Sequence, residues 1–123
     1  RSLDQRESGR LVSAVYLLLH NDMQKGFETL LDILTPVKLA KWTLMTVLPT
    51  YYKPQEEVFI KPTTVKNIIS YFEIPELIYK PRPSWEFYRN YKKIFLHMKN
   101  QVSDLLSPNT AAFSGFLMMA MEM

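Results

Sequence analysis

Eight prolines divide this chain into short segments. The sequence has only three glycines, and most of the prolines lie between runs of apolar residues. Proline lacks a backbone donor and interrupts both helices and central strands. Within the runs, apolar residues recur three and four positions apart, as in amphipathic helices, and strand-like alternation is nowhere sustained. We therefore predict an all-α fold, a compact single-domain bundle or stacked-helix array of five to six helices with Pro-marked connectors.

Cap residues and helix breakers place the boundaries of these helices. Asn21, Thr35 and Ser84 each precede a periodic apolar run and are typical N-cap residues, and Thr63 or Thr64 is expected to cap another helix. The predicted helices cover residues 11–20, 22–34, 36–48, 65–72, 85–106 and 111–123. These boundaries depend only on residues that are close together in the chain.

The domain organisation follows from length and composition. A chain of 123 residues with 47% apolar residues fits one globular domain. We expect residues 1–10 to be a polar lead-in and residues 11–123 to form a single helical domain, within which residues 49–62 are undecided between a helical turn and an extended segment. Because the first residue is Arg1 and not Met, we expect the chain to be part of a longer intracellular protein, in either the nucleus or the cytoplasm.

Motifs for catalysis or metal binding are missing from the sequence. It has no Cys, no glycine-rich phosphate loop and no G-x-S-x-G nucleophile motif. His20 and His97 have no second ligand at metal-binding spacing, and we expect His20 to favour the negative C-terminal end of a helix. Glu28 and Asp32, four positions apart, are typical of a solvated acidic face. We expect no enzyme, no cofactor and no metal site; an enzyme that uses Glu28, Asp32 or His97 ranks third among the functions.

Residues 79–100, YKPRPSWEFYRNYKKIFLHMKN, combine aromatic and basic side chains. They include six of the 15 Lys and Arg residues but one of the 12 acids, so the positive charge is local. On a helical wheel the apolar residues share one stripe, formed by Tyr88, Tyr91, Phe95, Met98, Val102 and Leu105 and widened by Phe87, Ile94 and Leu106. The polar residues share the opposite side, which holds Glu86, Arg89, Lys93, His97, Asn100 and Asp104, with Lys92 and Lys99 at its edge. Rings and cations therefore lie on different faces, whereas proteins that bind single-stranded nucleic acid need both on one face.

The basic face supports two hypotheses besides a solvated surface. In one, it contacts phosphates through its cations, which are Lys80, Arg82, Arg89, Lys92, Lys93 and Lys99. In the other, it binds a protein through the residues that the core does not claim, which are Arg82, Trp85, Arg89 and Leu96. A net charge of +3 is low for a dedicated nucleic-acid-binding domain, so nucleic acid is the secondary hypothesis.

The first and last helices carry more apolar residues than one core-facing stripe needs. In residues 11–20 one stripe consists of Leu11, Ala14, Val15 and Leu18, and a second of Val12, Tyr16 and Leu19. A helix that is apolar on both faces is normally packed between neighbours. In residues 111–123, Phe113, Phe116 and Met119 belong to a Met-rich run that is either core or a partner-binding surface. Both runs are too short to cross a bilayer, so we expect no membrane association.

Together these patterns lead to one primary hypothesis. We expect a non-catalytic α-helical protein–protein interaction module, a scaffold that mediates homo- or hetero-oligomerisation through its first or last helix. The alternative is a nucleic-acid-binding helical domain that uses the basic face of the helix at residues 84–106.

Overall fold

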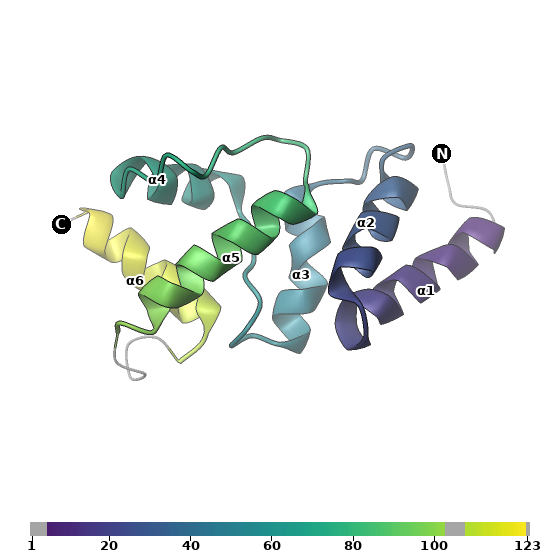
Figure 1. Ribbon diagram of the computed structural model, residues 1–123, viewed down its shortest axis with the longest axis horizontal. Helices are drawn as coiled ribbons and strands as arrows, with labels where there is room; N and C mark the ends of the chain where they lie inside the picture. The colour runs from purple at the N-terminus through teal and green to yellow at the C-terminus, as the bar shows by residue number, and fades with distance from the viewer. Residues whose placement is uncertain (1–4, 103–107, 123) are drawn as a thin grey trace.

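The computed structural model describes residues 5–102 and 108–122, and over these ranges it contains six α-helices and no strand (Figure 1). The helices are α1 (Gln5–His20), α2 (Met23–Leu34), α3 (Trp42–Tyr52), α4 (Pro62–Tyr71), α5 (Trp85–Lys99) and α6 (Thr110–Glu122). Helices α1 and α2 form one end of the molecule and α4, α5 and α6 the other, with α3 between them (Figure 1). The predicted compact all-α fold is confirmed.

Helices α1 and α2 come close together at Gly26. A Cβ atom at this position would lie 2.7 Å from Cα of Leu18 and 2.8 Å from the carbonyl oxygen of Ala14. Ala14 and Leu18 are themselves buried, at 0% and 4% exposed. Glycine is therefore the residue that allows the two backbones to approach at this crossing.

The start of α2 and the chain after it differ from the prediction. Asp22, not Asn21, is the N-cap residue, and its carboxylate accepts a hydrogen bond from the Lys25 N–H (3.2 Å). Thr35 closes α2 instead of opening the next helix, and its hydroxyl donates to the Leu31 carbonyl (2.6 Å). Thr35 still has helical backbone angles, and Pro36, which has no N–H, ends α2 directly after it. The prediction that Thr35 begins the next helix is therefore wrong.

Helix α3 begins at Trp42 and continues through Pro49 to Tyr52, whereas the sequence predicted residues 36–48. Pro49 is buried, and its missing N–H leaves the ladder of α3 one bond short. Two threonine hydroxyls bond to carbonyls one turn earlier, Thr46 to Trp42 and Thr50 to Thr46, both at 2.8 Å. The packing of α3 therefore overrides the helix-breaking tendency of proline.

The other helix ends follow the prediction in part. The Ser84 side chain caps α5 by accepting from the Phe87 N–H at 3.2 Å, as predicted. Helix α4 begins with Pro62 after Lys61, with no side-chain cap, so the predicted threonine caps are wrong. Helix α5 ends at Lys99 and not at residue 106, and residues 103–107 lie outside the described part of the chain.

The first helix is longer than predicted. It begins at Gln5, so residues 5–10 of the expected polar lead-in are helical. Residues 1–4, which belong to the same prediction, lie outside the described residues. The expected helix started at the first apolar stripe because polar residues add no periodic signal.

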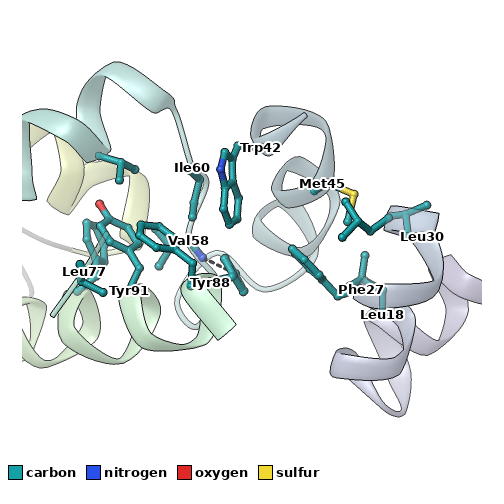
Figure 2. Close-up of a cluster of buried hydrophobic side chains, with 14 of the residues drawn as sticks. Leu18, Phe27, Leu30, Trp42, Met45, Val58, Ile60, Leu77, Tyr88 and Tyr91 are labelled. Atoms are coloured by element: carbon teal, nitrogen blue, oxygen red, sulfur yellow. Dashed lines mark hydrogen bonds between the residues drawn. The ribbon is translucent and has the colours of Figure 1, made fainter. Parts of the chain in front are cut away.

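The core runs through the middle of the molecule and is rich in aromatic rings (Figure 2). Phe27 of α2 stacks on Tyr88 of α5 with a 5.8 Å centroid distance, and the Trp42 ring lies 6.4 Å from that of Phe27. The undecided segment contains the end of α3 and a turn at residues 54–56, and over residues 57–61 it has neither helix nor strand and runs as an extended stretch toward α4 (Figure 1). In it Val58 and Ile60 are buried while Phe59, between them, is 38% exposed.

Candidate interaction surface

Helix α1 packs with one apolar stripe and exposes the other. Ala14 and Leu18 are buried beside α2, but Val12 is 70% exposed and Tyr16 is 61% exposed. Within residues 5–102 and 108–122, no neighbouring helix covers these two side chains. The expectation that both stripes pack between neighbours is therefore wrong for Val12 and Tyr16, whereas Leu19 of the same stripe is half-buried.

Helix α3 repeats this pattern more strongly. None of its 11 residues is charged. Its buried side faces the core with Trp42, Met45, Thr46 and Pro49. Its exposed residues are Thr43 and five large apolar residues, namely Leu44 (41% exposed), Val47 (41%), Leu48 (43%), Tyr51 (87%) and Tyr52 (49%). A helix that is apolar all round is normally buried all round, so the outer side of α3 lacks the cover that its composition predicts.

Ring contacts join the two exposed stripes. The centroid of the Tyr16 ring lies 5.0 Å from that of His20, which lies 4.9 Å from that of Tyr52. The Tyr52 hydroxyl and Nδ1 of His20 are 3.2 Å apart, at hydrogen-bonding distance. His20 thus stands at the C-terminus of α1, as expected, and also bridges two helices. We call the combined surface the α1–α3 face, and it consists of Val12, Tyr16, Leu44, Val47, Leu48, Tyr51 and Tyr52.

A hollow of about 140 Å³ adjoins the α1–α3 face where α1 and α3 end. Its apolar lining comes from Leu18, Leu19, Met23 and Pro49. Its polar lining comes from His20, Asn21, Tyr52, Lys53 and Glu57. Because His20, Asn21, Tyr52 and Lys53 are exposed, the hollow opens to solvent. His20 and Tyr52 contribute both to this hollow and to the ring contacts of the face.

A polar cluster around Glu57 lies at the inner side of the hollow. Glu57 is only 7% exposed, and its Oε1 accepts hydrogen bonds from the Tyr88 hydroxyl (2.8 Å) and from Nζ of Lys92 (3.0 Å). The Tyr88 hydroxyl also accepts from the Val58 N–H at 3.1 Å. Burial, and after it the negative charge of Glu57, raises the pKa of Tyr88 above its ordinary value. The cluster pairs one carboxylate with one ammonium and so fixes the extended segment against α5.

The six cations of the proposed nucleic-acid surface differ in their exposure. Lys80, Arg82, Arg89 and Lys93 are exposed, whereas Lys92 pairs with Glu57 and Lys99 is only 9% exposed. Lys80 and Arg82 line a second hollow, of about 250 Å³, together with the acids Glu76 and Glu86. Arg82 also donates to the Thr35 hydroxyl at 3.3 Å. The aromatic stripe of α5 is buried as predicted, with Tyr88, Tyr91 and Phe95 at 0–2% exposed.

The residues that were predicted to bind a protein partner fall into three groups by exposure. Phe113 is 1% exposed and packs on Phe95 with a 5.1 Å centroid distance, so it belongs to the core. Trp85 is half-buried, with its ring 5.7 Å from that of Phe27 and 5.9 Å from Nζ of Lys92. Leu96 and Phe116 are half-buried as well. The exposed members are Arg82, Arg89 and Met119.

The three residues that were weighed for catalysis lie exposed on two different helices. Glu28 and Asp32 are exposed and line a shallow hollow on α2, and His97 is exposed on α5. Across residues 5–102 and 108–122, no three His, Cys, Asp or Glu side chains are grouped closely enough to hold a metal ion. Among the six described helices, none combines the length and the apolar character needed to cross a membrane.

Sequence reasoning missed the α3 part of the α1–α3 face because it placed the third helix about six residues too early. The signal was nevertheless present, since WTLMTVLPTYY contains no charged residue. No protein-family model matches the sequence, and comparison with curated proteins and with solved structures likewise gives no match. Function is therefore inferred from the surface of this chain alone.

Proposed function

We propose that this chain is a helical protein–protein interaction module that docks its partner on the α1–α3 face. One observation carries the proposal: the ring contacts of Tyr16, His20 and Tyr52 join two exposed apolar stripes into one surface. Contiguous apolar patches on a folded protein mark interaction sites, whereas apolar residues that are scattered singly need no explanation. Tyrosine is also enriched at the centres of protein interfaces, because its ring is rigid and its hydroxyl can still find a polar partner.

Affinity purification from lysate, with and without nuclease, tests this proposal. The bait is the full chain as the wild type, as Leu48→Glu within the face, and as Ile78→Glu outside it. Ile78 is 70% exposed, so its substitution adds the same charge to an apolar surface elsewhere. We expect wild type and Ile78→Glu to retain the same proteins, and Leu48→Glu to lose them. Retention of every protein by a folded Leu48→Glu variant would contradict the proposal.

Self-association is one form of this function. Light scattering across a dilution series measures it directly, since a dimer that uses the α1–α3 face dissociates on dilution and is absent from the Leu48→Glu variant. A strict monomer at all concentrations leaves a hetero-partner as the only form of the proposal.

Nucleic-acid binding remains the second candidate because Lys80, Arg82, Arg89 and Lys93 are exposed and belong to neighbouring segments. Such binding weakens steeply with salt, as cations released from phosphates return to compete. The test is fluorescence anisotropy of labelled RNA and DNA at low and at physiological salt, with Lys93→Glu as the variant. No retention at low salt rejects this candidate, and salt-sensitive binding that Lys93→Glu weakens supports it.

A further inference from the structure

We infer that the occupant of the α1–α3 face is an amphipathic helix of a partner protein, with an aromatic anchor for the hollow and acidic residues at the two ends of its apolar stripe. This inference rests on the proposed function and adds the chemistry of the partner. Three features of the described residues support it: the length of α3, the charges that adjoin it, and the volume of the hollow.

The length of α3 and the charges of its two cap residues indicate what kind of partner fits it. At 11 residues, α3 extends for about 16 Å, which corresponds to roughly three turns of a helix lying along it. The residues that directly precede and follow it are Lys41 and Lys53, and both are exposed. The outer side of α3 is therefore an uncharged apolar strip with an ammonium group at each end. A helix with apolar residues at every third and fourth position and a carboxylate at each end of that stripe is complementary in both shape and charge.

The hollow specifies the anchor. A cavity of about 150 Å³ with an apolar lining accommodates a benzene ring, and the hollow measures about 140 Å³. Its lining is mixed, with Met23 and Pro49 on the apolar side and Glu57 and His20 on the polar side. Tyrosine and tryptophan combine a ring with one donor group, so they satisfy both sides of the hollow better than phenylalanine does. His20 and Tyr52 are exposed members of the lining and also make the ring contacts of the α1–α3 face, so we expect a helix on the face to place its anchor there.

A membrane surface is the competing occupant, because an aromatic and apolar strip between lysines also suits anionic lipids. A bilayer presents a broad fluid surface and has no ring-sized projection that would fill the hollow. The observations therefore favour a protein helix, and lipid binding becomes an outcome of the test.

The test uses a displayed library of random peptides about four helical turns long, selected on the immobilised full chain. Parallel selections use Leu48→Glu and the double variant Lys41→Glu/Lys53→Glu. On the wild type we expect enrichment of peptides with apolar residues at helical spacing, one Tyr or Trp, and Asp or Glu at the ends. The double variant should bind those peptides about five-fold more weakly, as expected for two exposed ion pairs, and should enrich basic ends instead.

The outcomes separate the inference from the proposed function. Enrichment of the same peptides by wild type and by folded Leu48→Glu overturns the proposed function. Enrichment that depends on Leu48 but shows neither acidic ends nor an aromatic anchor overturns only the partner chemistry. No enrichment, together with binding to phosphatidylserine vesicles that Leu48→Glu abolishes, overturns the inference and assigns the face to lipid. No enrichment and no vesicle binding overturns the inference alone, since the capture of proteins from lysate decides the proposed function.

Discussion

The hydroxyl of Tyr88 donates a hydrogen bond to Oε1 of Glu57 over 2.8 Å and accepts one from the backbone N–H of Val58 over 3.1 Å. A single buried oxygen therefore ties helix α5 to the extended segment at residues 57–61. The described part of the chain contains no strand that could pair with this segment, so side chains satisfy its buried backbone groups. This bond leads to the first prediction.

Replacing Tyr88 by phenylalanine should destabilise the protein by about 1–3 kcal/mol, because it leaves the buried Val58 N–H without a partner and removes one of the two hydrogen bonds to Oε1 of Glu57. Urea unfolding followed by circular dichroism measures the change. Tyr71→Phe is the matched control, since Tyr71 is 58% exposed and its change should stay within about 0.5 kcal/mol. Equal midpoints for the two variants would show that the Tyr88 bonds contribute nothing to stability.

Stability should fall at alkaline pH. Burial raises the pKa of both Tyr88 and Tyr91 above their ordinary value near 10. Above about pH 10 the unfolded chain loses these protons while the folded chain keeps them, so unfolding releases protons and becomes more favourable as pH rises. The two tyrosines cause no loss of stability below about pH 10. Above that pH, each should lower the free energy of unfolding by about 1.4 kcal/mol per pH unit.

Tyr91→Phe separates this effect from other titrations in the same range. Above about pH 10, the free energy of unfolding of this variant should fall less steeply with pH than that of the wild type, because unfolding releases one proton fewer. Urea midpoints at about pH 9, 10 and 11 provide the comparison. If the two slopes agree, the buried hydroxyl of Tyr91 does not resist ionisation in the folded state.

Alanine substitution of two glycines should change the stability in opposite directions. Gly26→Ala should destabilise by about 1–3 kcal/mol, because its Cβ would overlap the backbone of Leu18 and Ala14, which cannot move without shifting a helix. Gly115 lies within α6, and no atom of the described residues comes within 4 Å of the corresponding position, so Gly115→Ala should stabilise by about 0.5–1 kcal/mol. Thermal unfolding of both variants measures the difference, and a neutral Gly26→Ala would refute the close approach.

Thr46 makes a further prediction about the extended segment. Its hydroxyl accepts from the buried Ile60 N–H at 2.9 Å while donating to the Trp42 carbonyl at 2.8 Å. Thr46→Val should cost about 1–3 kcal/mol by leaving that N–H unpaired. Thr50→Val removes only a donor to the Thr46 carbonyl from a half-buried position, and its cost should be smaller. Denaturant unfolding of the two variants ranks them, and the reverse order would argue against this role of Thr46.

Several features of the fold were predictable because they depend on neighbours within one helical turn. The aromatic stripe of α5 and its cap at Ser84 follow from residue spacing and from local hydrogen bonding. The predicted helix boundaries between residues 35 and 52 were wrong because the local signals there are ambiguous. A threonine such as Thr35 can cap the start of one helix or bond to a carbonyl at the end of the helix before it. Pro49 remains helical because it lies on the side of α3 that packs into the core.

The sequence alone determined the helix content, the division by prolines and the separation of rings from cations on α5, since each depends on interactions between residues a few positions apart. The tertiary structure decided which apolar stripes are covered and which cations are free. Lys92 pairs with Glu57, which is 35 residues away, and His20 meets Tyr52, which is 32 residues away. No local pattern encodes such contacts, because they arise only when distant segments fold against one another. The exposed α1–α3 face is likewise what remains after that packing.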